Sequence, residues 1–269
     1  MTTTRLNVCA VVSCLFAISI TCTPSSIAAV GLDTASAAYL FEEGSGDVAL
    51  DSSGNGNDGE CRNGPTWVDG RFGKAMEFNG VDACVVVAEP IGLPEGNAPR
   101  TLTLWLKWAE IKWPAPGIEP MGYGANVPGQ RLGIWITNEH GLGLETCGVG
   151  MMFPWEGDTD WHHLAISYPE GETTSDMFKL YFDGVAQEGI LLGAAQDQEL
   201  NTSAGPLAIG VLPDPLVYHF NGAIDEVAIF AEELSPAQIA DIAENGLLGG
   251  TAVSPAGKLA TAWGHVKAR

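Results

Sequence analysis

Short apolar runs recur along this chain between clusters of Gly, Asp, Asn and Pro, and this pattern restricts the fold more than any other feature. Over residues 102–108 apolar and polar side chains alternate, which is the period of a half-buried β-strand. The dipeptide Asp183-Gly184 is a hairpin signal between two such runs. Further strands are predicted over residues 75–78, 83–87, 132–137, 164–168, 178–182, 207–209 and 223–230. The pattern predicts an all-β fold, a two-sheet antiparallel sandwich of the jelly-roll type.

One segment near the C-terminus departs from the strand pattern and predicts a short helix over residues 236–244. Ser235 is placed to cap its first turn, and Pro236 occupies the first helical position. Gly246 follows the segment and ends it. The expected architecture is therefore two sheets with one short C-terminal helix.

Two terminal segments are expected to lie outside the folded domain. Residues 1–29 combine one basic residue, an apolar stretch and small residues at the end, which is typical of a secretory signal peptide. An alternative is a lipoprotein signal ending at Cys14, for which the apolar stretch is short. Residues 248–269 form a basic tail predicted to be flexible, so the domain spans residues 30–247. The mature chain has no predicted transmembrane segment and is expected to be secreted or held at the cell surface.

The charge balance excludes one class of partner. The chain has 12 Lys and Arg against 33 Asp and Glu, a formal net charge of −21. Such a surface repels the phosphates of nucleic acids and of anionic lipids. Neutral glycans, extracellular or cell-surface proteins and cations remain as expected partners.

Three cysteines lie beyond the predicted signal peptide, namely Cys61, Cys84 and Cys147. In an oxidising compartment one disulfide and one remaining thiol are expected, and Cys61 with Cys84 is the pair closest in sequence. The alternative is three free, buried thiols. Zinc is not indicated, because none of the three belongs to a Cys-x-x-Cys or His/Cys cluster.

Several consecutive motifs resemble those of one family. They are residues 39–46 (YLFEEGSG), 51–59 (DSSGNGNDG), 64–75 (GPTWVDGRFGKA), 78–82 (FNGVD), 105–107 (WLK), 161–165 (WHHLA), 220–227 (FNGAIDEV) and 234–236 (LSP). In these motifs residues 37–247 resemble a laminin-G-like, concanavalin A-type jelly roll. The resemblance implies the sandwich fold, and it leaves function open, because such sandwiches host lectins, adhesion modules, enzyme accessory domains and hydrolases.

Catalytic patterns are missing from the sequence. Hydrolases of this kind place two carboxylates about 5 to 5.5 Å apart on one strand, in a Glu-x-Asp-x-x-Glu pattern. The nearest string, residues 156–160, lies in a turn-like context and lacks the final Glu. The adjacent His162 and His163 would point to opposite faces of a strand and are expected to pack and form hydrogen bonds. The chain is therefore not predicted to be an enzyme.

Calcium is the cofactor that the acidic turns favour, because hard cations take several oxygen ligands. One candidate cluster contains Asp51 and Asn55, together with Asn57 and Asp58, in a Gly-rich turn. The resemblance to the laminin-G-like family implies a second candidate calcium site, in which Asp225 would hold a structural calcium ion with oxygens of Glu43 and Gly44. The alternative is that the turn residues cap backbone amides and that Asp225 is a buried hydrogen-bond acceptor.

Aromatic residues in expected loops provide a candidate binding surface for sugars. The candidates are Trp113, Tyr123 and Trp155, with Asn126 and Gln130 nearby, whereas Trp67, Trp105 and Trp161 coincide with family motifs and are expected in the core. We therefore expect a secreted, non-catalytic module that binds carbohydrate or protein and is stabilised by calcium. The alternatives are a glycoside hydrolase or lyase of the same fold, and a structural component of the cell surface or matrix.

Overall fold

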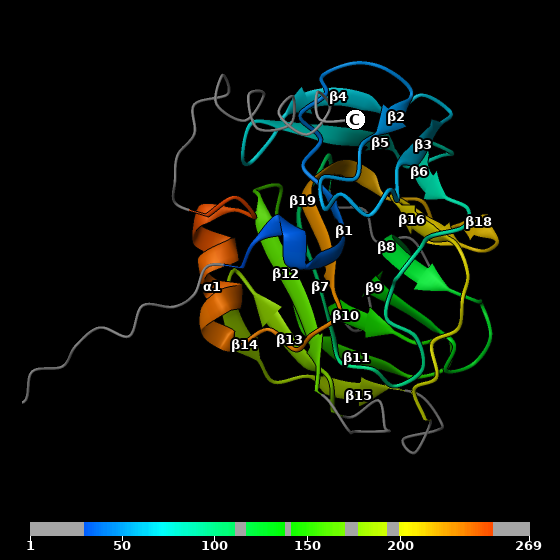
Figure 1. Ribbon diagram of the computed structural model, residues 1–269. Coiled ribbons are helices and arrows are strands. Elements are labelled where there is room, and N and C mark those ends of the chain that lie inside the picture. Colours follow the sequence, from blue (N-terminus) through cyan, green and yellow to red (C-terminus); the bar gives the residue numbers. More distant parts are fainter. Residues whose placement is uncertain (1–29, 111–116, 138–140, 170–176, 193–198, 250–269) are drawn as a thin grey trace, which may run out of the picture.

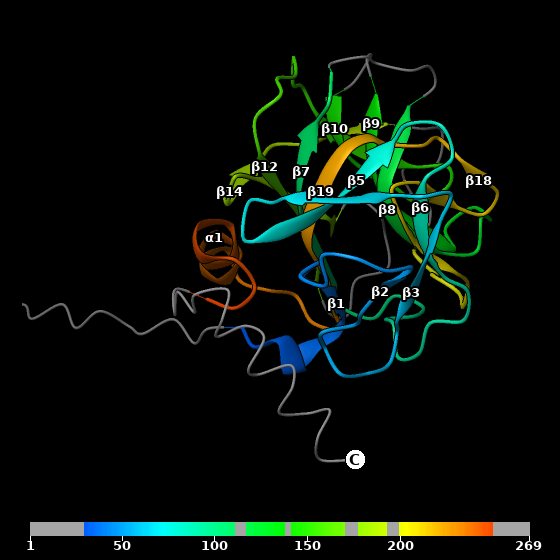
Figure 2. The same cartoon turned by 90° about the horizontal axis from the view of Figure 1, so that it is seen from above.

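The computed structural model describes residues 30–110, 117–137, 141–169, 177–192 and 199–249 (Figure 1). The predicted signal peptide, residues 250–269 of the predicted tail and Trp113 lie outside these residues. Two large antiparallel sheets pack face to face, and one helix, α1, lies on the outer side of one of them (Figure 2). Within these described residues, the predicted all-β sandwich with one short α-helix is confirmed.

The first sheet has eight strands. In spatial order they are β14 (Val185–Gln187), β13 (Lys179–Phe182), β12 (His162–Tyr168), β7 (Arg100–Trp108), β19 (Asn221–Phe230), β5 (Lys74–Asn79) and β4 (Thr66–Asp69), and β1 (Ala35–Tyr39) pairs with β19. The leucines of β7 face the main core between the sheets, as the alternation predicted. Lys107 on the other face of β7 is exposed.

The second sheet has nine strands. In spatial order they are β15 (Ile190–Leu192), β11 (Gly150–Phe153), β10 (Gly141–Glu145), β9 (Arg131–Thr137), β8 (Ile118–Gly124), β16 (Leu207–Ile209), β6 (Cys84–Val87), β3 (Gly59–Arg62) and β2 (Val48–Ala49). A short pair, β17 (Leu212–Pro213) with β18 (Leu216–Val217), and the 3-10 turn η1 (Leu32–Thr34) complete the described elements. Several strands were not predicted. Among them are β8, β10 and β11, in which glycines and Pro120 obscure the alternation.

Helix α1 (Pro236–Asn245) forms as its capping signals predicted and ends one residue later than expected. The Ser235 hydroxyl accepts a hydrogen bond from the Gln238 amide, and the Gln238 side chain binds the Ser235 amide in return. Ile239 and Ile242 pack with Tyr181 of β13 on the outer face of the eight-stranded sheet. The sheet is therefore apolar on both faces beneath the helix.

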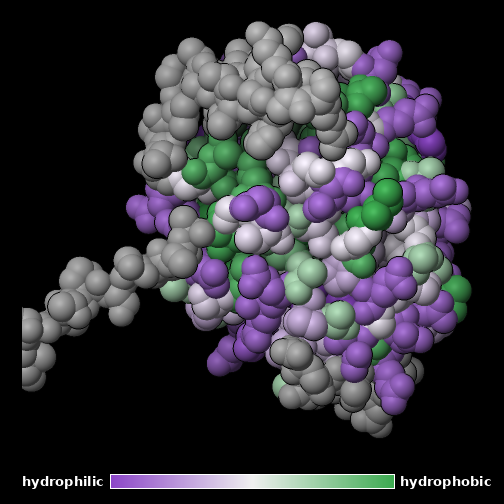
Figure 3. Space-filling model, in the orientation of Figure 1, coloured by the Kyte–Doolittle hydropathy of each residue, from purple (hydrophilic) through white to green (hydrophobic). Residues whose placement is uncertain are grey.

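The surface is mainly hydrophilic on the face drawn in Figure 3, with smaller hydrophobic areas between the polar side chains. The large apolar side chains that are exposed are spread over several loops and strand ends; they include Val81, Ile91, Val185 and Ile190. Among the described residues, no helix has the length and apolar character needed to cross a membrane.

Candidate functional site

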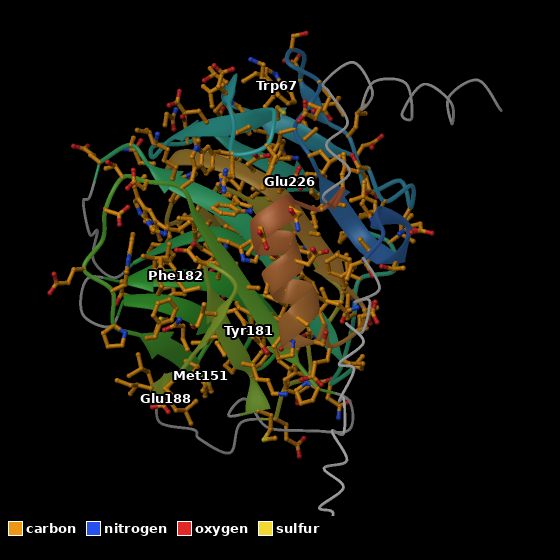
Figure 4. The ribbon with its side chains drawn as sticks, turned by 90° about the vertical axis from the view of Figure 1, so that its left-hand side faces the viewer. Trp67, Met151, Tyr181, Phe182, Glu188 and Glu226 are labelled. Atoms are coloured by element: carbon orange, nitrogen blue, oxygen red, sulfur yellow. The ribbon has the colours of Figure 1, made fainter. Side chains whose placement is uncertain are left out.

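A pocket of about 650 Å³ lies beside α1 on the outer side of the eight-stranded sheet. This is the side of the molecule that Figure 4 shows, with α1 in front of the strands. The pocket is lined by Arg71, Trp105, Trp161, Asp183, Gly184, Val185, Ala240, Ala243 and Glu244. Its volume is in the range that small-molecule sites usually have.

Helix α1 and the β13–β14 turn form two adjacent walls of the pocket and are in direct contact. Gly184 has a φ of 76°, the left-handed conformation that the hairpin turn requires. A Cβ at Gly184 would lie 3.0 Å from Cα of Ala240 and 3.1 Å from Cβ of Ala243. Glycine is therefore needed there both for the turn and for the close approach of the helix.

A tight turn over residues 70–73 carries Arg71 into the pocket. The Gly70 amide donates to the Gly73 carbonyl, 2.9 Å away, and closes the turn. The Arg71 guanidinium lies 4.7 Å from the ring centroid of Trp105 and 5.0 Å from that of Phe72. Within the described part of the chain no carboxylate forms an ion pair with Arg71. The two rings orient the guanidinium group at the edge of the pocket.

The floor of the pocket contains two tryptophans. Trp105 is 5% exposed and packs edge-on against Phe72, as expected for a core position. Trp161 is half-buried, just before β12. Its indole ring therefore offers an apolar surface of the kind on which sugar rings stack.

A histidine between two carboxylates lies behind the Asp183 wall. Nδ1 of His162 is 2.9 Å from Oδ2 of Asp183, and Nε2 is 2.8 Å from Oδ1 of Asp158. Burial lowers the pKa of His162, but the hydrogen bonds to both carboxylates outweigh it and the net shift is upward. Burial raises the pKa of Asp183, whereas hydrogen bonds from His162 and the His163 amide lower it further, so the net shift is downward. Asp183 is held as a carboxylate in the pocket wall.

His163 points to the opposite face of β12, as predicted. Its Nε2 is 2.5 Å from Oγ1 of Thr103, and its ring packs against Trp105. Burial lowers the pKa of His163 to about 3, so the ring is neutral at physiological pH. His163 is a packing residue behind the pocket floor, which is the role expected for it.

The predicted aromatic surface is not assembled as expected. Tyr123 lies in β8 rather than in a loop and is 2% exposed; its hydroxyl donates to the Pro94 carbonyl and accepts from Arg100. The prediction of a stacking role for Tyr123 was wrong, because this ring fills the core. Asn126 and Gln130 do lie in the loop between β8 and β9, and Asn126 is exposed.

Trp155 is half-buried against other aromatic rings. Its ring centroid lies 4.6 Å from that of Trp108 and 5.5 Å from that of His162. Phe182, labelled in Figure 4, lies next to both Trp155 and His162. Trp155 therefore supports the imidazole behind the pocket wall.

The side chains predicted to bind calcium form hydrogen bonds to backbone groups. The Asp51 carboxylate accepts from the amides of Ala38, Ser53 and Asn57, each at 3.0 Å. The Asn55 side chain donates to the carbonyls of residues 35 and 36. Glu43 accepts from the Leu50 amide, and Gly44 has a turn conformation with a φ of 70°.

Asp225 is fully buried and accepts from the amides of Phe72 and Glu226. These carboxylate oxygens are engaged by the backbone, which is the alternative that the sequence left open. In the described ranges no group of three or more His, Cys, Asp or Glu side chains is arranged to hold a metal ion. Calcium binding stays a prediction, and no part of the site depends on it.

The predicted disulfide is contradicted by the strand register. Cys61 lies opposite Val85 and Cys84 opposite Arg62 in the β3–β6 pair, so the two cysteine side chains point to opposite faces of the sheet. Cys61 packs against the main core, whereas Cys84 belongs to a small separate apolar cluster. Both are free thiols, as is Cys147. A disulfide needs side chains that point toward each other, so this pair is not bridged.

The pocket residues Arg71, Asp183 and Glu244 were not predicted as site residues. Arg71 lies within one of the family-like motifs, Asp183 within the hairpin signal and Glu244 at the end of the helix, so each was assigned a structural position only. No local pattern links them, because the three segments meet only in the folded chain.

The nine-stranded sheet carries a second group that the sequence did not reveal. Arg131 of β9 forms ion pairs with Glu119 of β8 and Glu145 of β10. Glu119 is fully buried, and burial raises its pKa to about 8 although Arg131 lowers it. Nearby in β9, Trp135 meets Tyr218 edge-on at 5.2 Å. The complete burial of Glu119 keeps its carboxyl group away from any ligand and makes this group part of the framework.

Comparisons with known proteins agree with this architecture. Domain 4 of AbnA, a GH43 extracellular arabinanase from Geobacillus stearothermophilus solved in complex with arabinotriose, is 23% identical, with a TM-score of 0.57 over 78% of this chain and 98% of that one. The binding domain of Paraclostridial Mosquitocidal Protein 1 is 14% identical, with a TM-score of 0.54 over 79% of this chain and 52% of that one. A sialidase from Trypanosoma rangeli is 14% identical, with a TM-score of 0.58 over 84% of this chain and 35% of that one.

At these identities the likeness concerns the fold alone. No curated protein sequence matches the chain. Residues 79–240 match the family described as the concanavalin A-like lectin/glucanases superfamily. This match spans more than half of the chain and includes strands from both sheets, and the protein therefore belongs to the concanavalin A-like lectin/glucanase superfamily.

Proposed function

We propose that this protein is an extracellular, non-catalytic carbohydrate-binding module and that the pocket beside α1 holds the sugar. The observation that carries the proposal is the chemistry of the lining. Trp161 offers a ring for stacking, Arg71 offers N–H donors, and Asp183 and Glu244 offer carboxylate acceptors. A sugar ring has apolar faces and hydroxyls that both donate and accept, so it satisfies all three kinds of group.

The ligand is a neutral saccharide. One cation and two carboxylates line the pocket, and the whole chain has a net charge of −21, so a polyanionic glycan would be repelled. The similar arabinanase domain solved with arabinotriose supports a neutral oligosaccharide as the class to test first.

A glycan array probed with the protein from residue 30 onward, with and without chelator, tests the proposal. We expect binding to a defined class of neutral oligosaccharides, followed by measurement of Kd by calorimetry. The absence of any binding on the array, with and without chelator, contradicts carbohydrate binding and favours a protein partner or a structural role. Release of reducing ends from the bound glycan would instead show a glycoside hydrolase.

Two pocket variants and a control variant at a distant tryptophan test where the sugar binds. Trp161→Ala and Arg71→Ala should each weaken binding by about tenfold or more, because each removes one main contact worth about 1–3 kcal/mol. Trp135→Ala is the matched control, since Trp135 is also a half-buried indole but lies on the nine-stranded sheet. Loss of binding in Trp135→Ala alone would move the site to that sheet and reject the pocket.

A further inference from the structure

A bulge in the central strand β19 lies next to the pocket floor. The register of β19 against β7 shifts between Asp225 and Ala228, and Asp225 stands opposite Trp105. Glu226, inside the bulge, has a φ of 50°, which is unusual for a residue other than glycine. Asp225 and Glu226 are 0% and 1% exposed. Bulges and strained backbone conformations are typically retained where they position functional groups, and here they place two buried carboxyl groups at one point of the strand.

Asp225 holds the wall that carries Arg71. Its Oδ2 accepts a hydrogen bond from the Phe72 amide at 2.9 Å, and its Oδ1 accepts from the Glu226 amide at 2.8 Å. The backbone also runs close to this carboxylate at Gly70, where a Cβ would lie 2.6 Å from Oδ2. The position of the 70–73 turn therefore depends on the Asp225 carboxylate.

Glu226 holds the opposite wall. Because of the bulge its side chain leaves the sheet toward the C-terminal end of α1, and Figure 4 shows Glu226 beside that helix. Its Oε2 accepts from the Leu247 amide at 2.5 Å, just after the helix ends at Asn245. Leu247 in turn packs in the cluster beneath α1, so this hydrogen bond anchors the helix end that carries Glu244.

The segment held by Asp225 and the segment held by Glu226 approach each other at Gly246. A Cβ at Gly246 would lie 3.1 Å from Oε2 of Glu226 and 3.2 Å from the ring of Phe72. The Phe72 ring therefore touches the backbone that follows the helix. A movement of either anchor would change the spacing between Arg71 and Glu244 across the opening.

We infer that Asp225 and Glu226 are positioning residues that together set the spacing of the pocket walls and hence the affinity for the saccharide. The expected effect on affinity rests on the proposed function, whereas the positions of the two segments depend only on the hydrogen bonds that hold them. Neither carboxylate lines the pocket, so each acts through the segment that it holds.

Residue-resolved hydrogen exchange tests the structural part without any ligand. Asp225→Ala should speed exchange of the Phe72 amide and leave the Leu247 amide protected. Glu226→Gly should do the reverse, and because glycine adopts a φ of 50° without strain, the bulge can keep its backbone conformation in this variant. Each variant is the control for the other. If Asp225→Ala does not fold, Asp225→Asn replaces it, since the amide NH2 group that takes the place of one carboxylate oxygen cannot accept a hydrogen bond from the backbone.

Calorimetry with the glycan identified on the array tests the consequence. Both variants should weaken binding by about tenfold, the equivalent of one lost hydrogen bond. Glu226→Gln keeps an acceptor and should retain most of the affinity. Tyr123→Phe, which loses buried hydrogen bonds in β8, serves as a destabilised control that should bind as the wild type does.

The outcomes separate the inference from the proposed function. Given that the wild type binds sugar, two outcomes overturn the positioning role. In the first, neither variant speeds exchange of the Phe72 or Leu247 amide. In the second, each variant speeds exchange of its own amide but binds sugar with unchanged affinity. If the wild type binds no glycan, the proposed function fails, and the exchange data still decide whether the two carboxylates anchor the walls.

Discussion

At the scale of single residues, buried or half-buried polar groups account for the geometry of the pocket. His162 has a carboxylate on each ring nitrogen, and a neutral imidazole has only one N–H to donate. Both contacts are satisfied together only when the ring is protonated. The same protonation offsets the charge of Asp183 in the pocket wall.

This arrangement predicts a pH-dependent stability. The folded-state pKa of His162 is raised above its ordinary value of 6.5, so its contribution is full below about pH 6.5 and is lost as the pH rises through the raised value. The Tm of the wild type should therefore fall more steeply than that of His162→Asn over this interval. Thermal melts of both proteins from pH 5 to 9 check this, and equal slopes would contradict the protonated ring.

At the scale of elements, glycines and ion pairs decide how neighbouring strands meet. Glu119 lies over two glycines, and a Cβ at Gly122 or Gly133 would lie about 2 Å from its Oε1. The carboxyl group thus fits only because β8 and β9 lack side chains beneath it. Arg131 ties this group to Glu145 and so links three adjacent strands.

Breaking this link should destabilise the nine-stranded sheet. Arg131→Ala leaves the fully buried carboxyl group of Glu119 without its hydrogen-bond donor and Glu145 without its cation, which should cost about 1–3 kcal/mol in the free energy of unfolding. Urea denaturation measures the loss, and Lys74→Ala is a control, because the Lys74–Asp69 pair is exposed. A loss below about 1 kcal/mol for Arg131→Ala would show that the buried pair contributes no more than a surface one.

At the scale of the whole molecule, the acidic composition governs both partners and stability. A net charge of −21 on one compact sandwich implies repulsion among its own carboxylates. This repulsion favours cationic or neutral ligands and keeps copies of the protein apart.

Salt that screens this charge repulsion should therefore stabilise the folded protein. Raising NaCl from about 10 mM to about 300 mM shortens the Debye length from about 30 Å to about 6 Å, and Tm should rise by a few degrees. Differential scanning calorimetry in the two salts measures the change, with Na₂SO₄ at equal ionic strength as a comparison. A falling Tm would show that attractive ion pairs such as Arg131–Glu119 outweigh the general repulsion.

The candidate site was less predictable than the fold, for reasons that particular residues make clear. Trp105 and Trp161 were expected in the core from their motifs, and burial confirms this for Trp105, while Trp161 is only half-buried at the pocket floor. Tyr123 was misplaced because Pro and Gly around it resemble a loop, although β8 runs through them. Cys61 and Cys84 are close in sequence, yet the register of their strands separates the thiols.

By itself the sequence determined the all-β class, a helix over residues 236–244 and the acidic surface, because alternation, capping and charge are local or additive properties of the chain. Only the tertiary structure decided where a ligand could bind. The pocket joins a turn at residues 70–73, a hairpin at 183–185 and a helix end at 240–244, which are far apart in sequence. Their alignment depends on the bulge at Asp225 and Glu226, and a bulge is a mismatch between paired strands that no single strand's pattern records.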